Sequence, residues 1–225
     1  MNSSIICTVD VVLLTLKNAS LHVALLRRER EPFAGTWALP GGYVHAQEDR
    51  DTQDAAERVL RDKARVQSPY LEQLATFSGP ARDPRGWSLS VVYYALVSEE
   101  ALSRSLSPEL QLVGVDGLKG LPFDHQAVIE AAVARVRSKS VYSSLPVHLC
   151  PPEFTLPQLQ LVYEALLGEP VNKVSFRRKV AELGVLEEVV GAKEEGKPYR
   201  PAQLYRLKPE FRKSLSTTDR GINAG

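Results

Sequence analysis

The stretch GGYVHAQEDRDTQDAAERVLRDKARV, residues 41–66, carries most of the information about the fold. It begins with a glycine turn at Gly41 and Gly42, passes through a run of acids, and ends in a segment with helical spacing. From Thr52 to Lys63 the apolar residues recur with a period of about 3.6, and Thr52 can cap the helix start. A glycine turn that leads into an acidic helix indicates a site for phosphate groups and metal ions.

The bulk composition allows one large or two small globular domains. The chain has 225 residues, 44% of them hydrophobic and 24% charged, and a formal net charge of +1, so any signal for nucleic acid must be local. Its two cysteines, Cys7 and Cys150, form no disulfide framework and favour a reducing cytoplasm. The apolar run 5–16 contains Asp10 and has no basic leader, so we expect a strand and no membrane association.

The first half of the chain predicts a mixed sheet with two helices. Short apolar, β-branched runs indicate strands, and the polar turn 17–20 joins the first two in a hairpin. Residues 31–44 are punctuated by glycine and proline and form a structured loop. The expected strands are 7–16, 21–29, 70–79, 87–97 and about 110–113, and the helices are 52–63 and about 125–136.

The second half of the chain has a different pattern of predicted elements. A proline-punctuated linker at 139–150 precedes a helix that begins at Thr155 and ends at Gly168, and a second helix that runs from Asn172 to Gly184. A strand, a Gly/Lys loop and another strand follow, which is the outline of a winged helix. We therefore expect domains at 1–138 and 151–213, and a flexible tail at 214–225.

Residues 35–66 resemble the Nudix box, the signature of enzymes that hydrolyse nucleoside diphosphates linked to another group. Gly42 and Glu48 have the box spacing, but nine residues instead of seven separate Glu48 from Arg58. The box continues with glutamates where this helix has Val59 and Lys63. Only the intervening acidic position keeps a carboxylate, and the late glycine of the box is replaced by arginine.

These replacements matter because positions i, i+3 and i+4 of a helix share one face. Three carboxylates there would hold divalent ions, which prefer oxygen ligands, whereas a lysine ammonium repels a metal ion. Three hypotheses follow: an ordinary amphipathic helix, a Mg²⁺ or Mn²⁺ enzyme with displaced ligands, or a Nudix-like binding domain without hydrolysis or cofactor, which we favour. The displaced ligands would be Glu48, Asp49, Asp51, Glu57 and Asp62, with Glu48, Glu57 and Asp62 catalytic and Glu48 and Asp62 on the metal.

A second resemblance covers nearly the whole chain up to about Lys213. The segments RREREPFAGTWALPGGYV, PYLEQLATFSGPARDPRGWSLSVVYYALV and FDHQAVIEAAVARVR, followed by PPEFTLPQLQLVYEALLGEPVNKVSFRRKVAELGVLEE, are similar to the Nudix-related transcriptional regulators of NAD metabolism. Those proteins join a Nudix-like domain to a C-terminal winged helix. The resemblance implies that the first domain binds ADP-ribose or a related nucleotide, and that binding releases DNA.

The candidate ligand-binding residues gather around the loop 31–44 and the motif ARDPRG. Guanidiniums can grip a pyrophosphate in bidentate fashion, Asp83 could accept from a ribose hydroxyl, and Phe33 or Trp37 could stack on adenine. The plainer interpretation is a surface salt bridge for each arginine and core packing for Trp37. The set is Arg27, Arg28, Arg30, Phe33, Trp37, Gly41, Gly42, Arg58, Lys63, Arg82, Asp83, Arg85, Asp124 and His125.

The candidate DNA-binding residues lie on the second helix of the winged helix and on its loop. The segment VNKVSFRRKV, 171–180, is basic and lacks acids, as expected of a helix that enters the major groove. The alternative is a basic, solvated helix in a protein-binding module, which the acids of the wing support. The set is Asn172, Lys173, Ser175, Arg177, Arg178, Lys179, Lys193, Lys197, Tyr199 and Arg200.

Together these observations predict an α+β chain, a Nudix-like α/β/α sandwich with a mixed sheet followed by a winged helix-turn-helix. The expected function is a cytoplasmic, nucleoid-associated regulator, a repressor of NAD-related genes that responds to ADP-ribose. Reading a palindromic operator requires a homodimer, because one module contacts a short half-site. The rival functions are a metal-dependent Nudix pyrophosphatase with an appended winged helix, and a protein-interaction adaptor.

Overall fold

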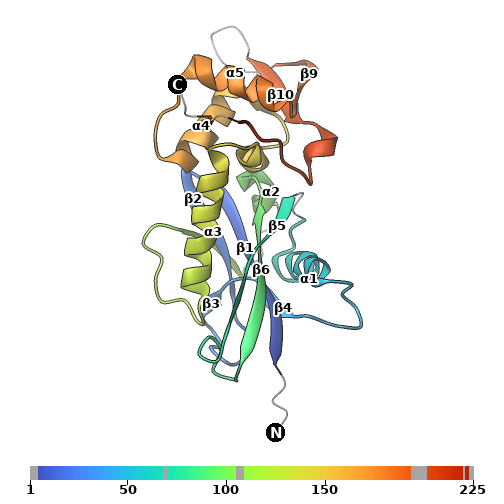
Figure 1. Cartoon of the computed structure of the whole chain (residues 1–225), viewed down its shortest axis with the longest axis vertical. Helices are drawn as coiled ribbons and strands as arrows, with labels where there is room; N and C mark the ends of the chain where they lie inside the picture. The colour runs from blue at the N-terminus through green and yellow to red at the C-terminus, as the bar shows by residue number, and fades with distance from the viewer. Residues whose placement is uncertain (1–4, 68–69, 105–108, 194–201, 220, 223–225) are drawn as a thin grey trace.

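The computed structural model describes residues 5–67, 70–104, 109–193, 202–219 and 221–222. Its elements form a sheet flanked by helices, with a smaller winged helix at one end (Figure 1). Among these residues, no helix combines the length and the hydropathy that a membrane span requires.

The larger domain is built on a seven-stranded mixed sheet. Its main path is β3–β2–β1–β6–β5, with β4 paired to β1 and β7 paired to β2. The pair β1–β6 is parallel and the other pairs are antiparallel. The strands are β1 (Ile6–Lys17), β2 (Ser20–Arg27), β3 (Trp37–Ala38), β4 (Gly41–Tyr43), β5 (Tyr70–Gly79), β6 (Ser88–Leu96) and β7 (Leu110–Gly114).

The sheet is buried on both faces because β1 is apolar on both sides. Val12 and Leu14 face the core under α3 (His125–Ser140), and Val11 and Leu13 face the core under α1 (Thr52–Val59). The short helix α2 (Glu99–Ser103) adds Leu102 to the α1 side. Figure 1 shows α3 and α1 on opposite sides of the strands, so the predicted α/β/α sandwich with a mixed sheet is confirmed.

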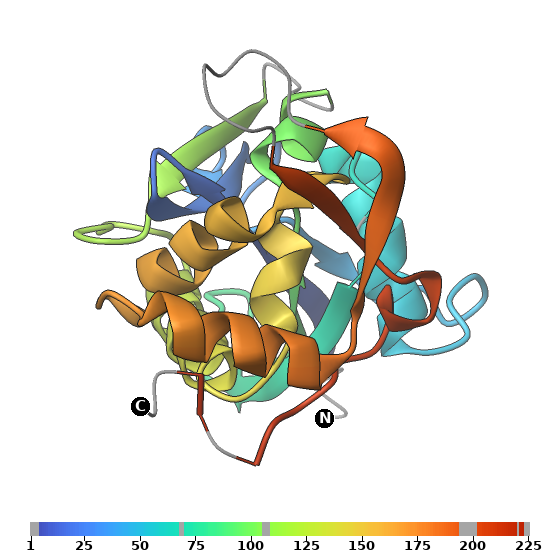
Figure 2. The same ribbon diagram turned by 90° about the horizontal axis from the view of Figure 1, so that it is seen from above.

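The smaller domain begins at η2 (Leu145–Leu149). Its other elements are β8 (Phe154–Thr155), α4 (Leu156–Leu167), α5 (Lys173–Leu183), β9 (Leu186–Lys193), β10 (Gln203–Leu207) and η3 (Pro209–Phe211). Thr155 and Gln158 form a capping box at the start of α4, and Asn172 caps α5 with 3.0 Å bonds to the amides of Val174 and Ser175. Gly168 and Gly184 end these helices in left-handed conformations, φ 75° and 67°, which only glycine adopts at little cost. The strands pair in the order β8–β10–β9, which completes the winged helix (Figure 2).

Local structure differs from the predictions around α1. Asp51, not Thr52, caps the helix, since its side chain accepts from the amide of Asp54 at 2.8 Å. Thr52 instead shares a 2.8 Å hydrogen bond with the Tyr93 hydroxyl. After Val59 the chain continues as a π-helical turn, η1 (Leu60–Ala64), and Arg65 ends it with φ 55°. Arg65 therefore takes up the left-handed conformation that the glycine of the Nudix box would supply.

The predicted linker and tail are also different in the structure. Helix α3 extends to Ser140, and the five residues of η2 are all buried, so 139–150 is packed rather than a loose connection. The segment 214–219 with 221 and 222 is not free either. It hydrogen-bonds to residues 141–144, and Ile222 is fully buried. Apolar Leu215 and Ile222 make this packing favourable.

Candidate functional site

Arg58 holds the acidic loop against α1. Its guanidinium donates to both oxygens of Asp49, at 2.7 and 2.8 Å, and to the backbone carbonyl of Tyr43 at 2.9 Å. The Asp49 side chain is only 3% exposed. The hydrogen bonds from Arg58 lower the pKa of Asp49 to about 2. Arg58 and Asp49 therefore stabilise the loop, and neither group points to a ligand.

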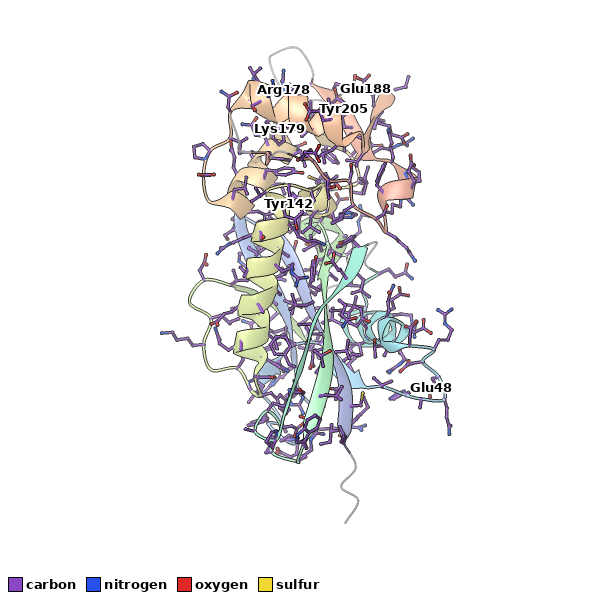
Figure 3. The ribbon with its side chains drawn as sticks, viewed as in Figure 1. Glu48, Tyr142, Arg178, Lys179, Glu188 and Tyr205 are labelled. Carbon is purple, nitrogen blue, oxygen red and sulfur yellow. The ribbon has the colours of Figure 1, made fainter. Side chains whose placement is uncertain are left out.

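The remaining acids of the box face different directions. Glu48 lies on the exposed loop beside α1 and pairs with His45 at 3.0 Å (Figure 3). Glu57 accepts from Gln53 at 3.5 Å, and Asp62 pairs with Arg61 at 2.8 Å. In the part of the chain that the structure describes, no group of three or more His, Cys, Asp or Glu side chains could hold a metal ion. The geometry assembles no displaced metal centre from these acids.

Lys63 occupies the place where the Nudix helix would present a carboxylate. Its ammonium donates to the backbone carbonyl of Gly41, while Val59 one turn earlier is fully buried. Burial lowers the pKa of Lys63, and the positive charge of Arg28 adds to the effect. A Cβ on Gly42 would lie 3.5 Å from the Lys63 nitrogen, and a Cβ on Gly41 would lie 2.0 Å from an Asp10 oxygen. The two glycines thus let a cation and a carboxylate approach the loop backbone closely.

Asp10 is the buried residue that the sequence did not single out for a site. It is 7% exposed and accepts a 2.6 Å hydrogen bond from the Ser90 hydroxyl. His125 Nε2 and Arg82 Nη2 each lie 3.7 Å from its carboxylate. The amide of Leu39 donates to His125 Nδ1 at 3.1 Å. Burial lowers the pKa of His125, so the ring is neutral at pH 7 and presents its remaining N–H toward Asp10.

Arg82 links this network to the start of α3. Its guanidinium is 8% exposed and binds both oxygens of Asp124, at 3.0 and 2.8 Å. Arg85 pairs in the same way with the buried Asp83, at 3.0 and 2.6 Å. Asp83 is therefore held by Arg85, and its role as an acceptor for a ribose hydroxyl stays a prediction. The structure brings Arg82, Asp124 and His125 together, but as an internal network around Asp10.

Two aromatic residues and an arginine form a surface beside this network. The rings of Phe33 and Phe123 meet edge to face with centroids 4.9 Å apart, and the Arg28 guanidinium lies 4.8 Å from the Phe123 centroid. Phe33 and Phe123 both have positive φ, 66° and 57°, which is uncommon for such bulky residues. Strained conformations of this kind concentrate at binding sites. The sequence drew attention to residues 123–125, directly before a helix, but Phe123 itself is not in the predicted ligand-binding set.

The other predicted ligand residues have more ordinary placements. Trp37 packs against the core under α3, as the plainer interpretation held. Arg27 donates to the Gly35 carbonyl at 3.3 Å, and the exposed Arg30 supplies a backbone carbonyl to Arg28. The Arg85 guanidinium lies 5.5 Å from the ring centroid of Tyr43, the residue directly after the glycine turn. Lys63 contacts the glycine turn directly, and Arg28 and Arg85 are close enough for Arg28 to act electrostatically on Lys63 and for Arg85 to act on Arg28.

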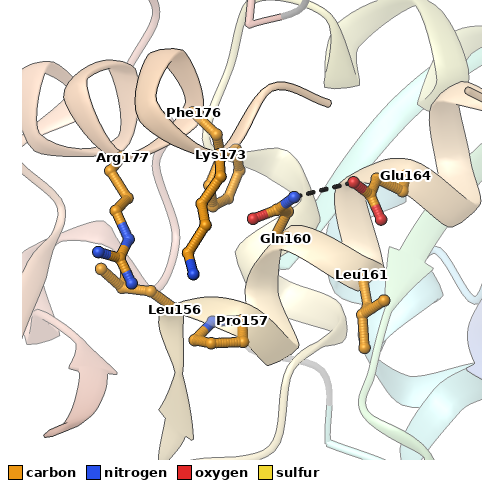
Figure 4. Close-up of a pocket in the computed structure, with 8 residues that line it drawn as sticks. All are labelled: Leu156, Pro157, Gln160, Leu161, Glu164, Lys173, Phe176 and Arg177. Atoms are coloured by element: carbon orange, nitrogen blue, oxygen red, sulfur yellow. Dashed lines mark hydrogen bonds between the residues drawn. The ribbon is translucent and has the colours of Figure 1, made fainter. Parts of the chain in front are cut away.

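The basic residues of α5 divide into two groups. Lys173 and Arg177 extend beside a cleft of about 240 Å³ toward Leu156 and Pro157 at the start of α4 (Figure 4). Arg178 is 69% exposed on the outer face of the domain, with Glu182 no closer than 3.9 Å (Figure 3). All three cations are exposed, and α5, which carries them, lies at the end of the molecule opposite the large sheet (Figure 1).

Lys179 is a correction to the predicted DNA-binding set. It is only 3% exposed, and its ammonium donates to the backbone carbonyl of Gly221 in the C-terminal segment. Its position three residues after Phe176 places it on the buried side of α5, which makes a DNA contact unfavourable. Asn172 and Ser175 lie in the first turn, where Asn172 serves as the helix cap. Lys197, Tyr199 and Arg200 lie outside the described residues, and Lys193 ends β9.

A mixed sheet between helices, with a cation-lined glycine turn at one end and a basic winged helix at the other, defines a Nudix domain fused to a DNA-binding module. Residues 8–132 match the family described as NUDIX domain, and residues 146–207 match the NrtR DNA-binding winged helix domain. The chain belongs to the NrtR family of Nudix-related transcriptional regulators.

Relatives of known description support this assignment. A protein of Acinetobacter baylyi described as "ADPR responsive transcriptional repressor NtrR" is 41% identical over 204 residues, which cover 89% of this chain and 81% of the relative. The crystal structure of Shewanella oneidensis NrtR with a 27mer DNA is 37% identical, with a TM-score of 0.88 over 96% of this chain and 98% of that one. The NUDIX domain of the same protein with ADP ribose is 37% identical, with a TM-score of 0.54 over 60% of this chain and 90% of that one.

Proposed function

We propose that this chain is a transcriptional repressor that binds operator DNA through its winged helix and releases it when ADP-ribose binds the Nudix domain. The proposal depends on two features that occur together in this chain. The helical segment of the Nudix box has Val59 and Lys63 in place of carboxylates, and α5 carries three exposed cations. The first feature removes the usual metal ligands, and the second provides a surface for phosphates. The relatives described as responsive to ADPR and as complexed with DNA support both halves.

The nucleotide would bind around the glycine turn. Arg28, Lys63 and Arg85 supply positive charge for a pyrophosphate, and the exposed edge of Phe33 beside Phe123 offers a surface for the base. The lysine takes over the charge that a divalent ion supplies in a hydrolase, but it activates no water. Binding therefore requires no Mg²⁺ or Mn²⁺ and leads to no cleavage.

The winged helix would place α5 in the major groove, with Lys173, Arg177 and Arg178 near phosphates or base edges. A homodimer reading a palindromic operator fits this arrangement, because each module covers only one half-site. Control of NAD-related genes rests on the resemblance to the regulators of NAD metabolism. A DNA target supports a location in the cytoplasm with the nucleoid.

Calorimetry with ADP-ribose tests the nucleotide half of the proposal. The protein should bind ADP-ribose in EDTA with the same affinity as in Mg²⁺ or Mn²⁺, and the nucleotide should be recovered intact. Turnover on the order of 1 per second in the presence of metal would instead identify a Nudix pyrophosphatase with an appended winged helix. A matched control is Arg61→Gln, which removes an exposed cation of η1 whose guanidinium pairs with the neighbouring Asp62 at 2.8 Å.

A further inference from the structure

The C-terminal strap, residues 214–219 with 221 and 222, lies antiparallel beside the segment that joins the two domains. Ser143 and Thr217 form an antiparallel bridge, and backbone hydrogen bonds continue on both sides of it. Strand-like pairing of this kind fixes two segments in one register. The bonds are Ser144 N to Ser216 O at 2.9 Å, Ser216 N to Ser144 Oγ at 3.0 Å, Thr218 N to Tyr142 O at 2.8 Å, and Ile222 N to Val141 O at 2.6 Å.

The strap contacts both domains as well as the segment between them. Leu215 packs against the core between the sheet and α3. Ile222 is fully buried in the core of the winged helix, together with Phe176 of α5. The carbonyl of Gly221 accepts from the Lys179 ammonium, also on α5. Figure 2 shows the C-terminal segment passing beside α5. One short segment therefore ties the helix proposed to enter DNA to the end of α3.

Helix α3 connects this region to the nucleotide site. It begins at Asp124 and His125, which bind Arg82 and the Leu39 amide, and it ends at Ser140, directly before the segment that pairs with the strap. Its 16 residues span about 24 Å as a straight helix. A packed helix of this length moves as a rigid body, so a shift of its start is transmitted to its end.

Helix α4 is the second connection between the two domains, and it contacts the core between the sheet and α3. Val162 and Leu166 pack against the core under α3, and the Tyr163 hydroxyl donates to the Ser143 carbonyl at 2.8 Å. The same helix also supplies Leu159 to the winged-helix core. Helix α5 packs on α4 through the edge-to-face pair of Phe176 and Tyr163, and the strap gives α5 a second attachment, through Lys179, to the region that follows α3.

We propose that the C-terminal strap couples the nucleotide site to α5, so that ADP-ribose binding displaces α3 and the strap carries the displacement to the DNA-binding helix. The inference rests on the proposed function and names the element through which it is regulated. A ligand shifts such an equilibrium only by its different affinities for the two arrangements. Loosening the strap should leave nucleotide affinity and DNA affinity largely intact and remove the dependence of one on the other.

The test compares the full-length protein with Ser216→Pro and its control Ser216→Ala. Proline has no N–H and breaks the bond to Ser144 Oγ, whereas alanine keeps the backbone donor. The readout is the ratio of DNA dissociation constants with and without saturating ADP-ribose. Coupling of this type typically spans about 5- to 150-fold. The alanine variant should keep the wild-type ratio, and the proline variant should bring it close to 1.

Lys179→Met supplies a second variant, because it keeps the apolar stem and removes the donor to Gly221. It should also reduce the ratio. A third measurement needs no substitution: hydrogen exchange at the Thr218 and Ile222 amides should change when ADP-ribose binds the wild-type protein. Unaltered exchange at these amides, or proline and methionine variants that still release DNA like the wild type, would overturn the strap inference. A wild-type protein that ADP-ribose fails to release from DNA would instead refute the proposed function itself.

Discussion

The salt dependence of DNA binding should distinguish the exposed cationic side chains of α5, which contact phosphates, from the buried one, which does not. Arg177 and Arg178 are exposed, whereas Lys179 is 3% exposed and bonded to Gly221. Each phosphate contact contributes about 0.9 to the slope of log K against log salt. In the proposed homodimer, Arg177→Ala or Arg178→Ala removes two phosphate contacts and should reduce the slope by about 1.8. The factor by which the affinity falls between 50 and 200 mM salt should then be about tenfold smaller than for the wild type.

The assay is fluorescence anisotropy with a labelled duplex selected from a random pool by the wild-type protein, without ADP-ribose. Lys179→Met is the matched control, since it removes one positive charge from the same helix but from its buried side. It should keep the wild-type slope. Equal slopes for wild type and both arginine variants, or a slope for the methionine variant as shallow as theirs, would refute the assignment of the exposed face of α5 to DNA.

Three further outcomes follow from the structure. Burial lowers the pKa of His148 from 6.5 to about 4, so the stability it contributes is complete above pH 6.5 and is lost as the pH falls toward 4. When the pH is lowered from 7.5 to 4.5, the free energy of unfolding measured in urea should therefore fall by about 2.5 kcal/mol more for the wild type than for His148→Leu. Equal decreases for the two proteins would contradict this. Arg58 lowers the pKa of Asp49 to about 2. The stability that the pair contributes to the folded protein is therefore present above pH 3.8 and is lost as the pH falls toward 2. Asp49→Asn should cost about 2 kcal/mol at pH 7 in the same assay, and a neutral variant would show that the loop does not need the pair. Lys63→Gln should weaken ADP-ribose binding in calorimetry by about tenfold through loss of a charge-assisted contact, while Arg61→Gln leaves it unchanged; equal affinities for the two variants would remove Lys63 from the site.

Features encoded over a few residues could be predicted from the sequence. The helix starts at Thr155 and Asn172 and the helix ends at Gly168 and Gly184 depend on neighbouring residues alone, and the structure has each of them. The hairpin of β1 and β2 likewise follows from two apolar runs and a polar turn. These signals were sufficient for the winged helix and for most of the sheet.

Features that depend on distant contacts were missed. Asp10 interrupts an apolar strand, but only the approach of Ser90, Arg82 and His125 shows that it organises a buried network. The pair of Arg82 and Asp124, 42 residues apart in the sequence, is likewise formed only by the fold. A sequence shows which side chains can bind a nucleotide, and the fold decides which of them are already engaged.

Two errors have a common cause in burial. Lys179 was grouped with its basic neighbours, although its spacing from Phe176 places it on the buried face. The residues after Lys213 are polar and glycine-containing, which is typical of a tail, yet Leu215 and Ile222 pack in two cores and anchor residues 214–219 with 221 and 222. A few apolar residues at suitable distances were enough to order the segment.

The measurement that tests the central claim most directly is the affinity for a selected DNA duplex with and without ADP-ribose, in EDTA. The proposed function predicts tight binding without the nucleotide and an affinity at least about tenfold lower with it, in the coupling range of allosteric proteins. The nucleotide should be recovered uncleaved. An affinity that ADP-ribose does not change, or that changes only when metal is present and the nucleotide is hydrolysed, would contradict the account of a metal-independent nucleotide sensor.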